Sequence, residues 1–460
     1  MHNEATQKSH GRLRFEHLLE GVVWRHDRVV EFDESGLIDR IRDADPRHDR
    51  SLEPVAGLAV PGMPNLHSHA FQRAMAGLAE YRQDDADSFW TWRELMYAVA
   101  DRLSANQIET VARHLYGEML EAGYTSVAEF HYLHRPGPDV GAANPLGTAT
   151  DICTAAKSAG IAMTLLPVCY QKAGFGDQPA SEHQRRFTHG TEAFIDLWHA
   201  LAAAPGSARM GLAFHSLRAV DLGAMRRILD ALPLADRPIH IHVAEQPAEV
   251  AACLAHTGRR PVALLAGELG LDPRWCLIHA THVGSEEIRS IAAAGATVGL
   301  CPTTEGNLGD GLFPMDELLA AAGSFGIGSD SHVTVDPLEE LRWLEYGQRL
   351  RTGRRNVVEH ENTARTGTAL WAGAAAGGAR ALGIPAGTLA PHHRADIAVF
   401  DGPGELPADI GFDRCLFSGR SPGAREVYVA GRCRVAGGSL TAPQDPEAFA
   451  AILDAVRGRT

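Results

Sequence analysis

The chain has 460 residues, of which 45% are hydrophobic and 22% are charged, and its formal net charge is −14. This length exceeds that of one average domain and allows a large apolar core. The acidic balance argues against general nucleic-acid binding, which needs a basic surface, but a few local arginines can still attract a small anion into a pocket.

Neither the cysteines nor the hydropathy of the chain indicates a secreted or membrane protein. The seven cysteines are scattered and form no Cys-X-X-Cys pair, so we expect neither a disulfide framework nor a cysteine-based zinc site. Residues 1–10 lack the apolar run of a signal peptide. No uncharged apolar run approaches the roughly 20 residues that span a bilayer. We therefore expect a cytoplasmic protein with no membrane contact.

Both ends of the chain show the alternating pattern of antiparallel strands. This pattern covers residues 22–32 and 36–41 near the start, and 395–400 and 426–431 near the end. We predict a small β-sandwich domain built from both termini, comprising residues 1–60 and residues 386–460, the second part ending in a helix.

Between the termini, short apolar runs alternate with longer amphipathic segments, a pattern typical of βα units around a parallel sheet. Eight such strands favour an α/β fold of the TIM type, a (β/α)8 barrel over residues 61–385. The predicted strand cores are 58–60, 126–130, 162–168, 210–214, 238–243, 275–279, 296–301 and 324–328. The predicted helices are 105–122, 224–231, 262–270, 286–294 and 369–381. In such a barrel the chemistry gathers at the carboxyl ends of the strands.

The first predicted strand passes a Gly/Pro kink and ends in two histidines, His67 and His69. In an extended strand the side chains of residues i and i+2 point the same way, so these imidazoles could hold one metal ion. The pair alone would equally suit two ordinary polar residues at a strand end. The metal interpretation therefore depends on ligands from other strands.

The fifth strand supplies a second set of candidates. His240 and His242 share a face, and His242 lies nearer the strand end, which makes it the better ligand. His240 lies a layer deeper, where we expect a core histidine. Glu245 follows the strand, so its carboxylate can reach back over the mouth of the barrel.

The sixth and eighth strands complete the set. His279 is predicted to face inward near the top of its strand, whereas His282 has the opposite parity and belongs to the following loop. Asp330 stands at the tip of the eighth strand, after small residues that let the backbone approach closely.

Three imidazoles and a carboxylate suit a borderline divalent ion, with zinc the natural choice. A catalytic zinc ion lowers the pKa of a bound water toward roughly 7. That water needs a base and a proton carrier, for which Glu245 and His279 are candidates.

On these motifs the chain resembles the amidohydrolase superfamily, in its mononuclear deaminase branch. Within the branch it is most similar to the formimidoylglutamate deiminases, and the similarity covers nearly the whole chain. The segments that carry the closer match are 64–73, 88–93, 129–132, 215–218 and 329–332. The fourth strand offers His215 and Arg218 but no lysine to bridge a second ion, so one metal is expected rather than two.

The resemblance implies hydrolysis of N-formimidoyl-L-glutamate to N-formyl-L-glutamate and ammonia, in histidine degradation. It also implies that one Zn²⁺ per chain is bound by His67, His69, His242 and Asp330, and that Glu245 and His279 move protons. Which of Glu245, His279 and Asp330 acts as the first base stays open.

The substrate is anionic, and its two carboxylates need cationic partners. Arg93 and Arg218 are the candidates, because arginine forms bidentate pairs with carboxylates. Gln72, Tyr132 and His215 are expected to assist at the same mouth. Without the resemblance, Arg93 would equally suit a surface position at a helix start, and Tyr132 a place in the core.

Three alternatives remain at this point. A deaminase of an amidine-like nucleobase, such as a guanine, cytosine or adenosine-type base, would need a flat apolar slot and few arginines. A guanidine or iminomethyl amino acid is a nearer rival substrate. A non-catalytic barrel should have lost ligands, whereas this chain has all of them. We also expect a homodimer.

Overall fold

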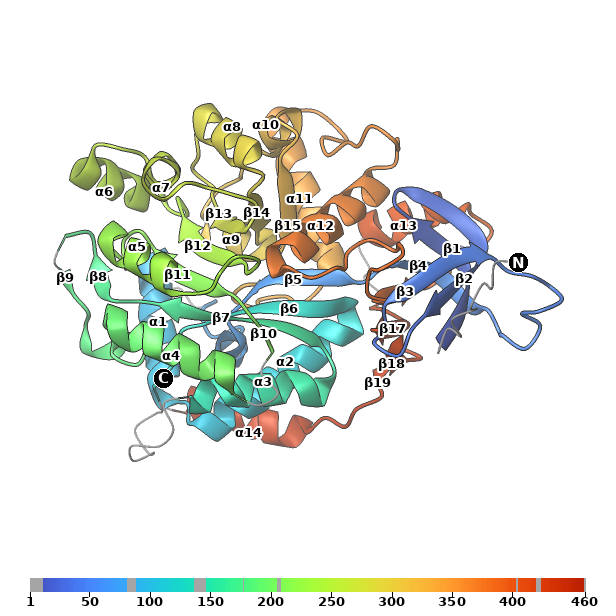
Figure 1. Cartoon of the computed structure of the whole chain (residues 1–460), viewed down its shortest axis with the longest axis horizontal. Coiled ribbons are helices and arrows are strands. Elements are labelled where there is room, and N and C mark those ends of the chain that lie inside the picture. Colours follow the sequence, from blue (N-terminus) through green and yellow to red (C-terminus); the bar gives the residue numbers. More distant parts are fainter. Residues whose placement is uncertain are drawn as a thin grey trace, which may run out of the picture.

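The computed structural model describes residues 11–80, 88–135, 146–176, 178–204, 208–402, 404–418 and 423–458. Figure 1 shows two parts, a barrel wrapped by helices and a smaller sheet beside it that contains the strands nearest both termini. Residues 1–10, on which the localisation argument partly rests, lie outside the described ranges. Among the helices of the described residues, none is long and apolar enough to cross a membrane.

The smaller part is one eight-stranded sheet. Its strands are β1 (Gly11–Glu20), β2 (Val23–Phe32), β3 (Ile38–Asp43), β4 (Val55–Pro61), β16 (Ile397–Phe400), β17 (Glu426–Val429), β18 (Arg432–Ala436) and β19 (Ser439–Leu440). They follow the order β19-β18-β17-β16-β4-β1-β2-β3. The sheet is curled. Phe15 on β1 and Tyr428 on β17 are separated by two strands in the sheet, yet their ring centroids lie only 6.1 Å apart. The apolar core enclosed in this way agrees with the predicted small β-sandwich.

The larger part is the predicted (β/α)8 barrel. Its strands are β5 (Met63–Ser68), β6 (Tyr124–His131), β7 (Ala162–Cys169), β11 (Leu212–Ser216), β12 (Ile239–Val243), β13 (Trp275–His279), β14 (Thr297–Leu300) and β15 (Ser324–Ile327). Neighbours pair in parallel in chain order, with β10 (Arg209–Met210) added to β7. A parallel bridge between Ser68 and Asp330 joins the first and last strands. A separate hairpin consists of β8 (Lys172–Gly174) and β9 (Gln178–Pro179).

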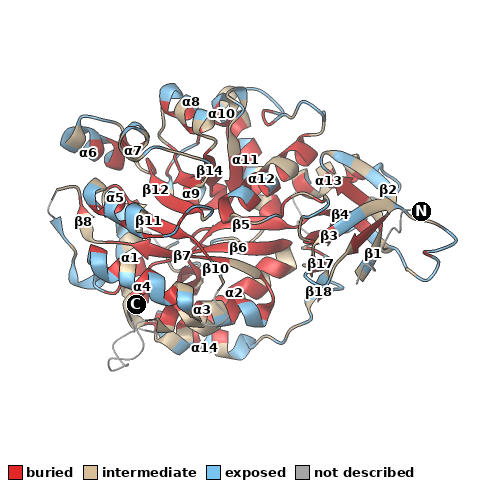
Figure 2. Cartoon of the chain, in the orientation of Figure 1, coloured by how far each residue is buried: buried red, intermediate tan, exposed pale blue. Residues whose placement is uncertain are grey.

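Helices surround the barrel with their inner faces buried and their outer faces exposed (Figure 2). All five helices predicted from the sequence are present. The helical elements are η1 (Ala70–Met75), α1 (Phe89–Arg102), α2 (Ala105–Ala122), α3 (Gly147–Ala159), η2 (Glu182–Gln184), α4 (Thr191–Ala203), α5 (Leu222–Ala231), α6 (Pro247–Thr257), α7 (Pro261–Leu269), α8 (Ser285–Ala294), α9 (Pro302–Leu308), α10 (Met315–Ala320), α11 (Pro337–Thr352), α12 (Thr366–Leu382), α13 (Ala408–Phe417) and α14 (Pro446–Arg457).

Local sequence explains where these helices begin and end, as α2 illustrates. Ser104 caps its N-terminus by accepting a hydrogen bond from the backbone N–H of Gln107, whose side chain accepts in return from the backbone of Ser104. Gly123 ends the helix with a φ of +106°, a conformation that favours glycine. The C-terminal helix α14 packs against α2, where Phe449 stacks on His114 at 3.9 Å between ring centroids.

The first barrel strand was predicted wrongly. Residues 58–60 belong to β4 of the terminal sheet, where they pair with β1 and β16, and the barrel begins with β5. The whole stretch 57–70 is buried, so hydrophobicity alone does not reveal where the chain passes from one sheet to the other. The passage is at Gly62, where an added Cβ would lie 2.2 Å from the side chain of Thr125.

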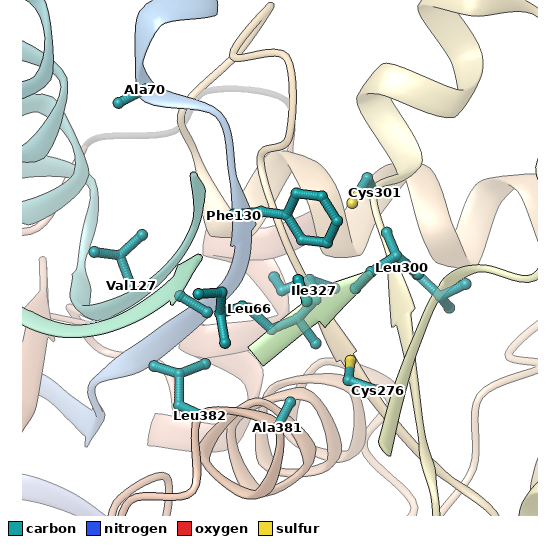
Figure 3. Packing of buried hydrophobic residues seen from close by; sticks show 14 of the residues in the cluster. Leu66, Ala70, Val127, Phe130, Cys276, Leu300, Cys301, Ile327, Ala381 and Leu382 are labelled. Carbon is teal, nitrogen blue, oxygen red and sulfur yellow. The ribbon is translucent and has the colours of Figure 1, made fainter. Parts of the chain in front are cut away.

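The floor of the barrel is closed by the end of α12. Figure 3 shows Ala381 and Leu382 below the strand residues Leu66, Ile327 and Cys276. His240 reaches this floor with Nε2 2.8 Å from the carbonyl oxygen of Ala381, so it is a core histidine, as predicted. With the floor filled by side chains, the open end of the barrel is the end where the strands terminate.

Candidate metal and active site

The end of β5 carries two buried histidines on one face. The ring centroids of His67 and His69 lie 4.6 Å apart. His69 Nδ1 is 3.0 Å from the carbonyl oxygen of Phe130 on β6. Because a carbonyl oxygen can only accept, Nδ1 of His69 carries the proton and Nε2 is left as a donor for a metal.

His242, on β12, completes a cluster of three histidines. One ring nitrogen from each of His67, His69 and His242 lies within 4.8 Å of the others, and Nε2 of His67 is 2.9 Å from Nε2 of His242. Burial lowers the pKa of all three imidazoles, which keeps them neutral at pH 7. Their lone pairs therefore converge on one small volume.

Asp330 adds a carboxylate to the cluster. Its Oδ1 lies 3.4 Å from His67 Nε2 and 3.3 Å from His69 Nε2. Its backbone donates to the carbonyl of His67 at 3.0 Å and accepts from the N–H of His69 at 3.3 Å. It adopts a φ of +45°, a left-handed conformation that costs about 1–3 kcal/mol in a non-glycine residue. The contact that closes the barrel thus also places the carboxylate.

The last strand approaches β5 closely because the residues between them are small. A Cβ added to Gly328 would lie 2.7 Å from Cβ of His67 and 2.9 Å from its carbonyl oxygen. The next residue, Ser329, is held by Asn65, whose Nδ2 donates to Ser329 Oγ at 2.6 Å and whose Oδ1 accepts from the Ser329 N–H at 3.1 Å. Glycine at position 328 is therefore a steric requirement of the site.

These donors fit a single divalent ion. Neutral imidazoles with a carboxylate form a set that zinc and similar borderline ions prefer. A cation held by Nε2 of His67 and Nε2 of His242 would need both rings to be neutral with the proton on Nδ1, and the lowered pKa of both imidazoles agrees with the neutral state.

Two further titratable groups lie beside the cluster. His279, at the end of β13, places Nε2 3.7 Å from Glu245 Oε1 and 3.7 Å from Asp330 Oδ2. Burial raises the pKa of Glu245 to about 7, and the nearby Asp330 adds to this effect while His279 opposes it. For His279, burial lowers the pKa, but Glu245, Glu305 and Asp330 outweigh it and raise the value to about 10. A pKa near 7 suits Glu245 to proton transfer, whereas a protonated His279 suits hydrogen-bond donation from Nε2.

Sequence reasoning missed two glutamates that support this pair. Glu249 accepts the backbone N–H groups of Ala244 and Glu245, both at 3.1 Å, and so fixes the turn after β12. Glu305 lies 3.2 Å from His279 Nδ1 through Oε1. The contact joins residues from different strands, so no local pattern in the sequence predicts it. The one feature that pointed to Glu305 was its position just after the seventh strand, at the same end of the barrel as His279.

A pocket opens above the cluster, and every residue predicted to bind substrate lines it. Its walls include aromatic side chains from α1 and from the loops after β6 and β7. The lining residues are His69, Gln72, Phe89, Trp92, Arg93, Met96, Tyr97, Tyr132, Tyr170, Phe187, His215, Arg218, His242, Glu245, His279, Leu308 and Asp330.

Two arginines stand on one side of this pocket. The guanidinium carbon of Arg93, on α1, lies 4.5 Å from the ring centroid of Trp90, and that of Arg218 lies 5.8 Å from the same centroid. Within the described part of the chain neither arginine forms an ion pair, and Arg93 Nε is buried without a hydrogen-bond partner. Both guanidinium groups are thus available to an anion.

Three further polar side chains line the same pocket. Gln72 Nε2 donates to the hydroxyl of Tyr132 at 2.8 Å, and both side chains are buried. His215 packs against Tyr132 and Tyr170, with ring centroids 5.9 Å and 4.4 Å away. By contrast, His282 turns away from the pocket, as predicted, and its Nε2 lies 2.8 Å from the carbonyl oxygen of Asp310.

Known proteins are similar to this chain along most of its length. The model of the Amidohydrolase family matches residues 58–433. A curated formimidoylglutamate deiminase of Pseudomonas aeruginosa is 50% identical over 415 residues, which cover 89% of this chain and 91% of that protein. An 8-oxoguanine deaminase of the same organism is 28% identical over 387 residues, 83% of this chain and 81% of that protein.

Solved structures show the same fold. An amidohydrolase from Brucella melitensis superposes with a TM-score of 0.89 and is 41% identical, covering 97% of this chain and 99% of that chain. An adenosine deaminase from Xanthomonas campestris with bound zinc has a TM-score of 0.76 at 20% identity, with 97% and 98% of the chains covered. At that identity the second likeness concerns the fold alone.

Proposed function

Since this chain belongs to the amidohydrolase family, we propose that it hydrolyses N-formimidoyl-L-glutamate to N-formyl-L-glutamate and ammonia, a step of histidine degradation. It is a hydrolase of C–N bonds in linear amidines. The observation that carries the choice of substrate is the pair of unpaired arginines, Arg93 and Arg218, in the same pocket as the histidine–aspartate cluster. A substrate that is cationic at one end and dianionic at the other matches both ends of this pocket.

We assign one Zn²⁺ per chain to His67, His69, His242 and Asp330. When bound, the ion supplies Lewis acidity that makes water a better nucleophile at neutral pH. The donor set and the neutral state of the imidazoles support this assignment.

Glu245, His279 and Asp330 are the groups that hold and move protons. The oxygen of water bonds to the formimidoyl carbon, and the bond from that carbon to the terminal nitrogen breaks. Glu245, with a pKa of about 7, can take a proton from the attacking water and deliver it to the departing nitrogen. His279 Nε2 faces the same space and holds the attacking oxygen, while Asp330 accepts a proton beside it.

The remainder of the pocket binds the glutamate moiety. Arg93 and Arg218 pair with the two carboxylates, since guanidinium groups match carboxylates in a bidentate fashion. Gln72, Tyr132 and His215 supply hydrogen bonds between the two ends. The amidinium end is attracted by Glu245 and Asp330.

The rival substrate class is a nucleobase, as in the 8-oxoguanine deaminase to which the chain is also similar. Such a base has no carboxylates to satisfy two arginines. The test is ammonia release by the purified protein from N-formimidoyl-L-glutamate, guanine and cytosine in parallel, with N-formyl-L-glutamate identified as the second product. Turnover of guanine or cytosine, with none of N-formimidoyl-L-glutamate, would refute the proposal.

We further propose that the protein is cytoplasmic and that its partner is a small anionic molecule and not a nucleic acid. We also propose that residues 1–60 and 386–460 form the small β-domain and that residues 61–385 form the barrel.

The protein is proposed to be a homodimer. The exposed apolar residues Trp343, Tyr346 and Leu350 lie on one side of α11 and support a second copy of the chain as the partner. Sedimentation velocity should show a dimer that the Leu350→Lys variant weakens. A monomer at micromolar concentration would refute the assignment.

A further inference from the structure

The geometry points to Glu305 as a positioning residue that fixes the orientation of the His279 ring, an inference that rests on the proposed function. The two nitrogens of His279 face different partners. Nδ1 lies 3.2 Å from Glu305 Oε1, and Nε2 lies 3.7 Å from both Glu245 and Asp330. An ionised carboxylate can only accept, so Nδ1 carries a proton and Nε2 is directed at the reacting groups.

Glu305 acts through His279 and not on the substrate. It is buried, and it is absent from the residues that line the pocket above the histidine–aspartate cluster. The thiol of Cys301 also lies close, since donor atoms of His279, Cys301 and Glu305 are within 4.8 Å of one another. A thiol is a weak hydrogen-bond partner, which leaves the carboxylate as the dominant one for Nδ1.

The carboxylate is itself held firmly. Its Oε1 accepts the backbone N–H of Cys301 at 2.9 Å, which ties the side chain to the first turn of α9. The same turn is anchored to α11, because Thr303 donates to Glu340 through its backbone N–H at 2.9 Å and its hydroxyl at 2.5 Å. Glu305 therefore offers His279 a fixed acceptor.

The backbone of His279 explains why such an acceptor is needed. Its φ is +65° and that of Ala280 is +50°, so the strand ends in two left-handed residues. The regular alternation of strand side chains does not set the ring in this conformation. The contact with Glu305 supplies the orientation that the strand does not.

Two substitutions separate the contact from its charge. Glu305→Gln keeps an oxygen that can accept from both Cys301 and His279, whereas Glu305→Met keeps the size and removes the acceptor. We expect Glu305→Met to lower kcat on N-formimidoyl-L-glutamate by about 10–100-fold, the usual effect of losing such a supporting contact, with KM and metal content unchanged. Glu305→Gln should retain most of the wild-type kcat.

The hydrogen bond at Nδ1 gives a readout that does not depend on the substrate. In the metal-loaded protein labelled with ¹⁵N-histidine, the His279 signals are assigned by their loss in His279→Asn. We expect an Nδ1–H signal that is protected from exchange with water in the wild type and in Glu305→Gln, and rapid exchange of that proton in Glu305→Met. If N-formimidoyl-L-glutamate is not turned over, the proposed function fails but the Nδ1–H measurement still decides the role of Glu305.

Glu345→Met is the matched control. Glu345 is an equally buried glutamate that accepts the backbone N–H groups of Val357 and Val358 and the Nε–H of Arg349, and among the described residues it has no hydrogen bond to His279. Its loss should lower the melting temperature without changing kcat or the His279 spectrum. An unchanged kcat and an unchanged Nδ1–H signal in Glu305→Met would overturn the inference, as would metal loss in that variant. If Glu305→Met does not fold, loss of the protected Nδ1–H signal in Glu305→Gln would overturn it instead.

Discussion

Replacing Arg218 with methionine tests how the pocket recognises carboxylates. An exposed ion pair contributes under about 1 kcal/mol, whereas removing one partner of a buried pair costs about 3–5 kcal/mol. Arg218 is half-buried in the pocket, beside Trp90 and without an ion-pair partner in the described chain. We therefore expect Arg218→Met to lose about 3 kcal/mol of transition-state binding energy, which corresponds to a loss of roughly 150-fold in kcat/KM.

The assay compares two substrates that share the reacting group. Initial rates of ammonia release are measured with N-formimidoyl-L-glutamate and with formamidine, which has no carboxylate. The loss should appear on the first substrate and be small on the second, because binding of the remote carboxylates also aligns the reacting carbon. Arg226→Met is the control, since Arg226 is an exposed arginine that pairs with Glu268.

The reasoning fails if Arg218→Met loses the same factor on both substrates. That result would mean that Arg218 supports the fold or the histidine–aspartate cluster, and the pairing of Arg218 with a substrate carboxylate would have to be abandoned. Metal content and the melting temperature of the variant would then show which of the two it supports.

Three further predictions concern the cluster itself. His67→Ala should lose both metal and activity, and a stoichiometric metal in the double variant with His69→Ala, measured by elemental analysis, would contradict the ligand assignment. Glu245→Gln and His279→Asn should fold and keep their metal but lose about 10²–10⁴-fold in kcat; near-wild-type turnover between about pH 6 and 9 in either one would remove it from the proton pathway. Gly328→Ala should push the last strand away from His67 and cost about 1–3 kcal/mol of stability, the usual effect of overpacking, together with metal affinity; an unchanged melting temperature and metal content would show that the strands can separate freely.

The placement of the candidate histidines could be predicted because it follows simple rules. Depth along the strand selected His242 over His240, parity selected His279 over His282, and the structure places each of them accordingly. The position of Asp330 followed from the small residues before it.

The wrong and missing predictions concern features that leave no periodic pattern in the sequence. Residues 58–60 were assigned to the barrel because a buried run gives no sign of the point where the chain changes sheets. Glu249 and Glu305 were missed because they bond to backbone groups and to a ring from another strand, and such contacts leave no periodic pattern.

The junction of β5 with the end of β15 has a consequence for how the protein matures. Asn65 and Ser329, which bond directly across this junction, are 264 positions apart in the chain. A growing polypeptide therefore holds His67 and His69 long before Asp330 has been synthesised, and it has no complete site to offer an ion. The intervening strands pair in chain order, so the contact between β5 and the end of β15 is the one that closes the barrel. An ion that binds only the closed form would stabilise that form by mass action. If these residues hold the proposed ion, metal uptake would report completion of the barrel.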